Sequence, residues 1–197
     1  VRVSIGEEIG LKTGLISNGK LVSAIKRLGF NNVYDTDFTA DLTIMEEGTE
    51  LINRIKANGQ LPLFTSCCPA WVRYAELYRP EYLENMSSAK SPHMMQGALI
   101  KHYYGPTHAK QKPENIAVVS IMPCTAKKAE SARPEMEVDG IRDIDAVLTV
   151  RELAKMIKRA GIDFRRLEDA TVDNPLAQFT GAGTIFGASG GVTEAAL

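Results

Sequence analysis

The sequence predicts an α/β fold in which parallel strands are flanked by helices. Three short apolar segments, residues 61–64, 116–122 and 146–148, have the length of strands, and stretches with helical spacing separate them. Each segment is continuously apolar rather than alternating, which is typical of parallel strands that are covered on both faces. With 197 residues and 44% hydrophobic content, the chain can bury one sizeable core or two smaller ones.

Two helices are expected before the first strand. In the first helix, Leu21, Ile25 and Leu28 recur at helical spacing, and Gly29 ends the segment. A short extended piece is expected at residues 32–34. A longer helix is expected from about residue 41 to residue 57, with these buried positions: Leu42, Met45, Ile52 and Ile55.

The first strand leads directly into two adjacent cysteines, Cys67 and Cys68. Pro69 cannot continue a central strand because it lacks an amide hydrogen, so the cysteines are expected where the strand gives way to a loop or a helix. The next helix is expected to begin after Ser91, with Pro92 in its first position, and to reach about residue 104.

The second and third strands also carry signals at their ends. The second strand runs into Pro123-Cys124, and the third runs into residues 149–152, whose sequence Thr-Val-Arg-Glu is a capping-box pattern. A helix is therefore expected over residues 150–160.

Charge and hydropathy exclude several classes of protein. The net charge of −1 indicates neither a nucleic-acid partner nor a membrane surface. No stretch approaches the roughly 18 apolar residues of a membrane span, so no membrane partner is expected. No secretory signal pattern follows Val1, and a cytoplasmic location is expected for a chain whose true N-terminus is not seen. Residues 190–197 have the pattern of a helix that is just beginning, and both ends are interpreted as cuts through a longer chain.

The three cysteines make a poor disulfide framework, because their number is odd and two are adjacent. A reducing compartment and thiolate chemistry are the better interpretation. The carboxyl ends of parallel strands are where ligand crevices form, so Cys67, Cys68 and Cys124 could meet in space. Soft thiolates there suit iron–sulfur ligation, and the alternative is that they are small buried apolar side chains.

Two motifs resemble the signatures of the iron-only hydrogenases. Thr65-Ser66-Cys67-Cys68-Pro69 is similar to the first signature, and residues 122–130 are similar to the second, whose pattern is M-P-C-x-x-K-x-x-E. Three flanking stretches are also similar to the family: residues 87–92, 140–147 and 186–192. The chain is identified on this resemblance as an incomplete catalytic domain of the family over residues 1–197. The resemblance implies two lobes with a metal cluster bound between them at the carboxyl ends of the strands.

The resemblance implies the H-cluster as cofactor, in which a [4Fe–4S] cubane is bridged through a cysteine to a diiron site with CO, cyanide and a dithiolate. Cys68 and Cys124 are implied as cubane ligands. The other two ligands belong to a C-x-x-x-C signature that is expected beyond Leu197, since no cysteine follows Cys124. Cys67 resembles the cysteine that passes the proton without binding the cluster, and adjacent side chains of extended backbone point apart.

Four more residues are implied to border the cofactor. Lys127 resembles the lysine that holds a cyanide ligand, and a solvated lysine at a helix start is the alternative. Met122 resembles the methionine packed against the diiron site, with an ordinary core methionine as the alternative. Phe186 is expected near the diiron site or in the core, and His93 either donates a hydrogen bond into the cofactor pocket or has no part in it. The other histidines are expected at the surface: His102 and His108.

A proton route is suggested by spacing and by the resemblance together. Glu47, Glu50 and Arg54 lie at i, i+3 and i+7 of a predicted helix, so they line one face, which on its own is typical of a solvated stripe. The family relays protons through two glutamates, a serine, a water and the proton-passing cysteine. Glu47 and Glu50 match the glutamates and Ser87 matches the serine. Arg54 matches an arginine near the entrance. Relay requires such groups at hydrogen-bond distances, directly or through water.

The implied function is the reversible reduction of protons to dihydrogen. Ferredoxin or accessory iron–sulfur domains are the implied electron partners, and maturation factors are implied as partners as well. The alternatives are an iron–sulfur assembly protein of the same fold and a hydrogen sensor. Cys67, Lys127 and the relay set argue against a mere cluster carrier, because a carrier needs none of them. The 197 residues are expected to be inactive alone.

Overall fold

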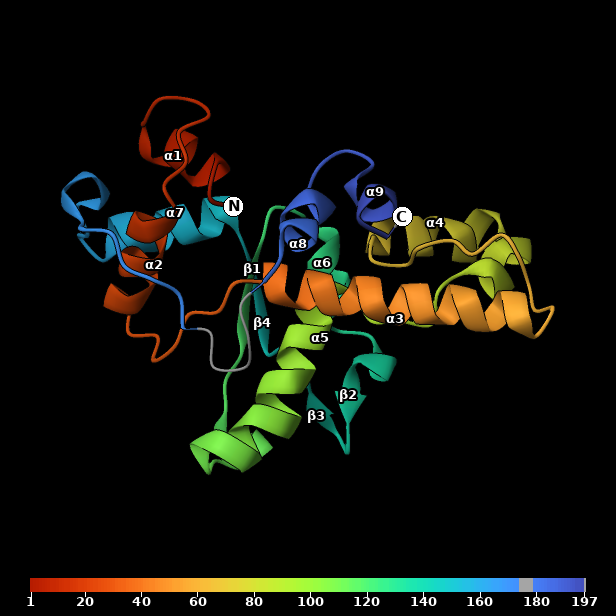
Figure 1. The fold of residues 1–197 in the computed structure, drawn as a ribbon. Helices are drawn as coiled ribbons and strands as arrows, with labels where there is room; N and C mark the ends of the chain where they lie inside the picture. Colours follow the sequence, from red (N-terminus) through yellow and green to blue (C-terminus); the bar gives the residue numbers. More distant parts are fainter. Residues whose placement is uncertain (174–178, 197) are drawn as a thin grey trace.

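A computed structural model describes residues 1–173 and 179–196 of the chain, in which helices surround a small parallel sheet (Figure 1). The α-helices are α1 (Ser4–Ile9), α2 (Asn18–Arg27), α3 (Asp37–Lys56), α4 (Pro69–Tyr78), α5 (Pro92–Ala98), α6 (Ala126–Glu130), α7 (Val150–Arg159), α8 (Gly181–Phe186) and α9 (Gly191–Ala196). The strands are β1 (Val119–Met122), β2 (Glu137–Val138), β3 (Ile141–Arg142) and β4 (Ala146–Thr149). Together these elements confirm the α/β class.

The parallel sheet consists of β1 and β4, with Val119 opposite Ala146 and Met122 opposite Thr149. The second and third predicted strands are therefore confirmed. The first, residues 61–64, is wrong as a strand, because only Phe64 pairs, through a single parallel bridge to Met86. Pro62 contributes no amide hydrogen to a ladder there. A separate antiparallel pair joins β2 to β3, which the sequence analysis does not predict.

Helix α7 begins where the capping box predicts. The Thr149 hydroxyl accepts a hydrogen bond from the amide of Glu152 at 3.2 Å, and the Glu152 carboxylate accepts one from the amide of Thr149 at 2.8 Å. Two amide hydrogens that the helix leaves unpaired are thereby satisfied. The cap fixes the point at which β4 turns into α7.

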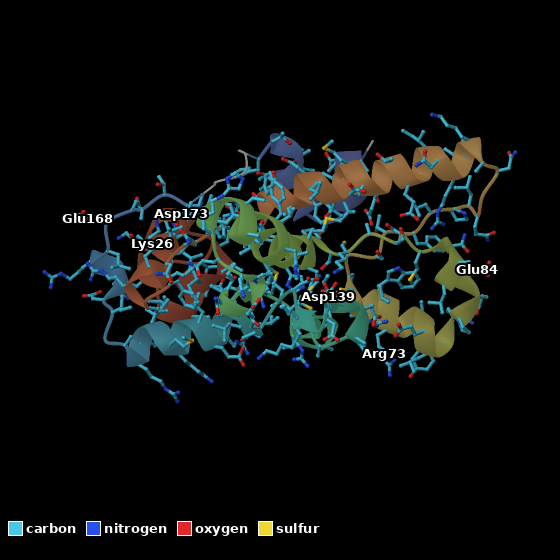
Figure 2. The ribbon with its side chains drawn as sticks, turned by 90° about the horizontal axis from the view of Figure 1, so that it is seen from below. Lys26, Arg73, Glu84, Asp139, Glu168 and Asp173 are labelled. Carbon is cyan, nitrogen blue, oxygen red and sulfur yellow. The ribbon has the colours of Figure 1, made fainter. Side chains whose placement is uncertain are left out.

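The larger hydrophobic core lies where α1, α2 and α7 meet, at the left of Figure 1. Its buried members are Ile5, Leu21, Ala24, Ile25, Val150, Leu153, Ala154, Ile157, Phe164 and Leu167. The Lys26 ammonium of α2 lies 3.0 Å from Asp173 Oδ1 at the same end of the molecule (Figure 2). Residues 32–34 form no strand; the Val33 carbonyl accepts from the amide of Asp173, and the Val33 amide donates to the Asp173 carboxylate.

A smaller core packs α5 against the sheet. Its buried members are Met94, Val118, Ile144 and Val147. Helix α5 begins at Pro92 with Ser91 as the N-cap, as predicted. It continues past the expected end as a π-helix over Leu99–Ala109. This core joins the start of α5 to β1, and it thereby brings His93 close to the strand.

Helix α3 begins earlier than predicted and buries a different face. Its buried residues are Thr39, Ala40, Thr43 and Glu47. Met45, Ile52 and Ile55 are 69%, 52% and 56% exposed, so the prediction that they are buried is wrong. Leu42 is half-buried. Helices α5, α8 and α9 pack against α3, and the threonines Thr39 and Thr43 bond side chains of α5. Apolar spacing shows which residues share a face, but it does not show which face a neighbour covers.

The end of the described chain also agrees with its sequence pattern, since α9 begins at Gly191; Leu197 lies outside the described residues. None of the helices in the described ranges is both long enough and apolar enough to cross a membrane.

Candidate functional site

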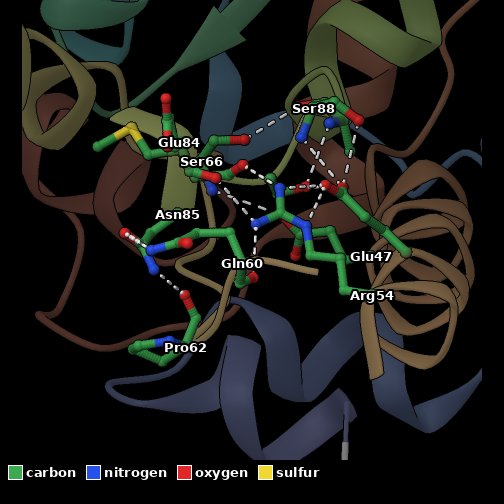
Figure 3. Close-up of polar contacts among 12 residues, drawn as sticks. Glu47, Arg54, Gln60, Pro62, Ser66, Glu84, Asn85 and Ser88 are labelled. Carbon is green, nitrogen blue, oxygen red and sulfur yellow. Dashed lines mark hydrogen bonds and ion pairs between the residues drawn. The ribbon is translucent and has the colours of Figure 1, made fainter. Parts of the chain in front are cut away.

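The Arg54 guanidinium of α3 lies among polar groups of the protein (Figure 3). Arg54 donates to Glu50 Oε1 from Nη2 at 2.6 Å and from Nε at 3.1 Å. The guanidinium also donates to the backbone carbonyls of Gln60, Glu84 and Met86. Both side chains of the ion pair are only 18% exposed, so the alternative of a solvated stripe is wrong.

Glu50 connects this ion pair to Ser87. The Ser87 hydroxyl donates to Glu50 Oε2 at 2.9 Å, and Ser88 donates to the same oxygen from its amide at 3.0 Å. Burial acts to raise the pKa of Glu50, but the hydrogen bonds from Arg54, Ser88 and Ser87 outweigh it and hold that pKa below its ordinary value. Glu50 is therefore ionised at neutral pH.

Glu47 lies one helical turn before Glu50 and is 4% exposed. Its Oε1 accepts a hydrogen bond from the amide of Ser66 at 3.4 Å, and the Ser87 hydroxyl, which donates to Glu50, lies near the same carboxyl group. Burial raises the pKa of Glu47 above its ordinary value, although the Ser66 amide and the Ser87 hydroxyl oppose the shift. Ser87 thus lies between two carboxyl groups whose pKa values move apart, which favours a directed proton transfer.

The half-buried thiol of Cys67 follows Ser66 in the chain. Burial raises its pKa to about 11, and the negative charge of Glu47 adds to the shift. The thiol therefore keeps its proton at neutral pH. Within the described residues, no hydrogen bond joins Glu47 directly to Cys67. Hydrogen bonds thus join Arg54 and Ser87 to Glu50, and Glu47 to the residue before Cys67, but none reaches the Cys67 thiol from Glu47 in the described part of the chain.

Cys68 and Cys124 are free thiols that each precede a helix. Cys68 is the N-cap of α4 and is exposed, whereas Cys124 lies between β1 and α6 and is half-buried. Helix α4 packs against α6, and Lys127 of α6 donates to the carbonyl oxygen of Cys67 at 2.7 Å, so the two cysteine loops are neighbours. In the described part of the chain, no three His, Cys, Asp or Glu side chains are placed to hold one metal ion.

Lys127 is held by the protein, so the alternative of a solvated lysine is wrong. Its side chain is 13% exposed, and its ammonium lies 2.9 Å from Oε2 of the buried Glu130. The same oxygen lies 2.7 Å from Nε2 of His93, whose Nδ1 lies 2.9 Å from the Ser120 hydroxyl. A polar chain of four residues therefore runs from β1 to the cysteine loops.

The protonation states of His93 and Glu130 in this polar group follow from their burial and their hydrogen bonds. Burial lowers the pKa of His93, although the hydrogen bond to Glu130 opposes the shift. Burial acts to raise the pKa of Glu130, but hydrogen bonds from His93 and Lys127 and the charge of Lys127 outweigh it and hold that pKa below its ordinary value. A neutral His93 thus donates from Nε2 to the ionised Glu130 and accepts at Nδ1 from Ser120. Both ring nitrogens have protein partners, so a link from His93 to a cofactor would pass through Glu130 and Lys127.

The remaining predicted site residues are Met122, Phe186 and the two histidines expected at the surface. Met122 ends β1 and packs, half-buried, against the smaller core. Phe186 ends α8, is half-buried, and belongs to a helix that packs against α3. Their places beside a cofactor stay predictions. His102 is only 24% exposed and faces the buried Asp143, so its expected surface position is wrong; His108 is exposed as expected.

A pocket of about 920 Å³ opens beside Glu50 and Arg54. These two residues and Ser88 form part of its lining, and apolar residues of α3 and α5 form another part. Glu47 and Ser87 lie inside the protein, with exposures of 4% and 7%. The pocket therefore gives solvent access to Glu50, while Ser87 and Glu47 are buried.

Two residues of the site, Glu130 and Ser120, are not among the predicted site residues. Glu130 is the last residue of the second motif, and its position three residues after Lys127 places both on one helix face. That spacing is the signal from which its contact with Lys127 could be found. Ser120 has no such signal, because a serine within a short apolar strand is not distinctive.

The donor set fits half of an iron–sulfur site. Thiolates are the ligands that iron–sulfur clusters use, normally four of them, and Cys68 and Cys124 supply two. The ammonium of Lys127 places a positive charge beside the loop that holds Cys67 and Cys68. The described residues are therefore suited to hold one side of such a cluster.

Comparison with known proteins places these features in a family. The family model described as "Iron only hydrogenase large subunit, C-terminal domain" matches residues 1–197. Over 197 residues the chain is 55% identical to Iron hydrogenase 1 of Clostridium pasteurianum, and the match covers 100% of this chain and 34% of that protein. At lower identity, 32% over 185 residues, it matches the cytosolic Fe-S cluster assembly factor narfl of Xenopus tropicalis, covering 89% of this chain and 39% of that one.

A solved structure supports the same relationship. The structure described as "Stepwise [FeFe]-hydrogenase H-cluster assembly revealed in the structure of HydA(deltaEFG)" has a TM-score of 0.87 and 44% identity, covering 99% of this chain and 48% of that one. The chain thus spans less than half the length of each of these relatives. With a family model that matches every residue, the chain belongs to the iron-only hydrogenase large-subunit family, C-terminal domain.

Proposed function

We propose that the protein to which this chain belongs interconverts protons and dihydrogen, 2H⁺ + 2e⁻ ⇌ H₂, with the H-cluster as its cofactor. The observation that carries the proposal is the series Arg54, Glu50, Ser87 and Glu47. Arg54 and Ser87 both donate to Glu50, and Glu47 accepts from the Ser66 amide in the loop that holds Cys67. The series begins at a pocket that Arg54 and Glu50 line. A protein that only carries a cluster has no use for such a series.

Each residue of the site then has a task. When bound, the H-cluster supplies the two-electron chemistry of hydrogen, as cofactors generally supply the chemistry that side chains cannot. Cys68 and Cys124 are proposed as two of the cubane ligands, with the cluster between two lobes at the strand ends. Lys127 donates to a cyanide ligand, and Met122 and Phe186 supply apolar cover that excludes water.

The proton path follows from the pKa shifts. Glu50, held by Arg54, takes up protons from the pocket, and Ser87 exchanges them between Glu50 and Glu47. Glu47 retains a proton more readily because its pKa is raised, and a water molecule carries it across the interval to Cys67. The Cys67 thiol, whose pKa is raised to about 11, would first pass its own proton on to the cofactor and would then be reprotonated from Glu47 through that water. The reverse sequence serves hydrogen oxidation.

The partners follow from the same proposal. Electrons come from ferredoxin or from accessory iron–sulfur domains, and maturation factors supply the cofactor in a cytoplasmic setting. The 197 residues contain three cysteines and hence, with Cys67 as the proton carrier, two cluster ligands. We expect this stretch to be inactive alone.

A second candidate is iron–sulfur cluster assembly, and the 32% identity to narfl of Xenopus tropicalis favours it. The buried relay and the protonated Cys67 favour the hydrogenase. Infrared spectroscopy of the matured full-length protein tests the proposal, because iron-bound CO and cyanide absorb where protein does not. We expect both sets of bands. Their absence from a protein that contains an iron–sulfur cluster would support assembly instead.

A further inference from the structure

A buried group of side chains lies behind Lys127 and takes no part in the proton relay. The Lys127 ammonium lies 2.9 Å from Oε2 of Glu130, and His93 Nε2 lies 2.7 Å from the same oxygen. His93 Nδ1 in turn lies 2.9 Å from the Ser120 hydroxyl. The exposures of His93 and Glu130 are 2% and 4%. The group therefore ties α6, α5 and β1 together in the protein interior.

The charges within this group require Lys127 and Glu130 to stay together. A buried carboxylate needs a cation, and removing one partner of a buried pair leaves an uncompensated charge. Lys127 supplies that cation to Glu130 at hydrogen-bond distance. A neutral His93 has a single N–H, which it donates to Glu130 Oε2, so the oxygen that accepts from the ammonium is also anchored to α5.

The hydrogen-bonding capacity of the ammonium shows what this anchoring achieves. A lysine ammonium has three hydrogens to donate. Two have acceptors here, the carbonyl oxygen of Cys67 at 2.7 Å and Glu130 Oε2 at 2.9 Å. Since both acceptors belong to packed parts of the protein, they fix the position of the nitrogen and the direction of the third hydrogen. A lysine that is already held this way loses less conformational entropy when it binds an anion.

We propose that Glu130 is the positioning residue of Lys127 and that His93 holds Glu130 in its place. The proposal deepens the proposed function and rests on it, because Lys127 is there the donor to a cyanide ligand. Glu130 acts through the ammonium and has no contact of its own with the cofactor. The direction of the Lys127 ammonium is then determined by α5 and β1, through His93 and Glu130, as well as by the flexible lysine side chain.

The test compares the infrared cyanide bands of the matured full-length protein and its variants. Glu130→Gln keeps an acceptor oxygen but removes the charge, so the ammonium is released from its anchor. We expect one cyanide band to shift in Glu130→Gln and in Lys127→Gln. In the Lys127→Gln background, Glu130→Gln should cause no further shift, because two residues that act through one contact are not additive. His93→Gln should shift the same band by less.

Two exposed neighbours serve as matched controls. Lys128→Gln and Glu135→Gln remove the same charges from side chains that bond Glu152 and Arg133, and neither should move a cyanide band. A band that stays in place in Glu130→Gln overturns the proposal. The proposal is also overturned if Glu130→Gln shifts the band by the same amount in the unsubstituted protein and in the Lys127→Gln background, since a merely structural role would have that effect.

Failure to acquire the cofactor is also decisive. If Glu130→Gln does not acquire the cofactor, His93→Gln takes its place, and its cyanide band shift is compared with and without the Lys127 substitution. If Lys127→Gln does not acquire the cofactor, Lys127→Arg takes its place. Loss of the cofactor from both the Glu130 and His93 variants, with a loaded Lys127 variant, overturns the proposal because their role then lies in folding. Absence of CO and cyanide bands from the unsubstituted protein would instead contradict the proposed function, so the two failures are distinguishable.

Discussion

The hydroxyl of Ser87 donates a hydrogen bond to Oε2 of Glu50 at 2.9 Å, at the point where the pocket gives way to the protein interior. The carboxyl group of Glu47 lies one turn away on α3, near the same hydroxyl. Arg54 and the serines lower the pKa of Glu50, whereas burial raises that of Glu47. Ser87 therefore lies beside two carboxyl groups of different proton affinity, as the proposed proton path requires.

Replacing Ser87 should interrupt that proposed path. We expect Ser87→Ala to lower hydrogen production by the matured full-length protein roughly 10²-fold or more, the lower end of what positioned proton transfer contributes. Ser88→Ala is the matched control, because its exposed hydroxyl also donates to Glu50, at 3.2 Å, without lying between the glutamates. Equal activities of the two variants would contradict the relay role of Ser87.

Replacing Glu47 should stop turnover without unfolding the protein. Glu47→Gln keeps the shape of the side chain but cannot carry a proton, and we expect a loss of about 10²- to 10⁴-fold in turnover. Burial raises the pKa of Glu47 above its ordinary 4.5, so ionising it reduces stability as the pH rises past that value. Glutamine does not ionise, and the variant should be at least as stable at pH about 7 in urea unfolding. Glu46→Gln, on an exposed neighbour, should change neither property.

Cys67 should matter for turnover but not for holding the cluster. We expect Cys67→Ala to abolish hydrogen production while the electronic spectrum of the cubane stays nearly unchanged, because Cys67 carries the proton and Cys68 is the ligand. Cys68→Ala is the comparison, and it should lose the cubane spectrum itself. Normal turnover by Cys67→Ala would remove Cys67 from the proton path.

His93 should make the protein less stable in mild acid. Its pKa lies below the ordinary 6.5 because it is buried, so the unfolded chain binds a proton that the folded protein does not. Its contribution to stability is present above that value and is lost as the pH falls below it. Urea unfolding of the cofactor-free full-length protein at pH about 7.5 and about 5.5 should therefore show a smaller loss for His93→Gln. His108→Gln, at an exposed site, should show the loss of the unsubstituted protein.

Local sequence signals predicted those parts of the fold that depend on neighbours in the chain. The capping box at Thr149 and the proline at position 92 determine helix starts by their own chemistry, and both starts are where the patterns place them. The face of α3 was predicted wrongly for Ile52 and Ile55, because burial depends on which element packs against the helix. The segment before Cys67 fails as a strand for the same kind of reason, since pairing needs a partner.

The site, like the fold, is divided into features that local sequence spacing predicts and features that depend on tertiary packing. The spacing of Glu47, Glu50 and Arg54 predicts a shared face, but only packing against the Ser87 loop turns that face inward. The contact between Lys127 and Glu130 follows from their separation along α6, whereas the contact between Glu130 and His93 joins residues far apart in the sequence. Sequence motifs pointed to the residues of the site, and tertiary packing determined their partners.

The central claim is that these residues deliver protons for hydrogen chemistry. It is tested most directly by measuring dihydrogen production by the matured full-length protein supplied with a low-potential electron donor. We expect steady production that is lost when Cys67 is replaced by alanine. A protein that holds the cofactor, with CO and cyanide bands in its infrared spectrum, but neither produces nor consumes dihydrogen would contradict the claim.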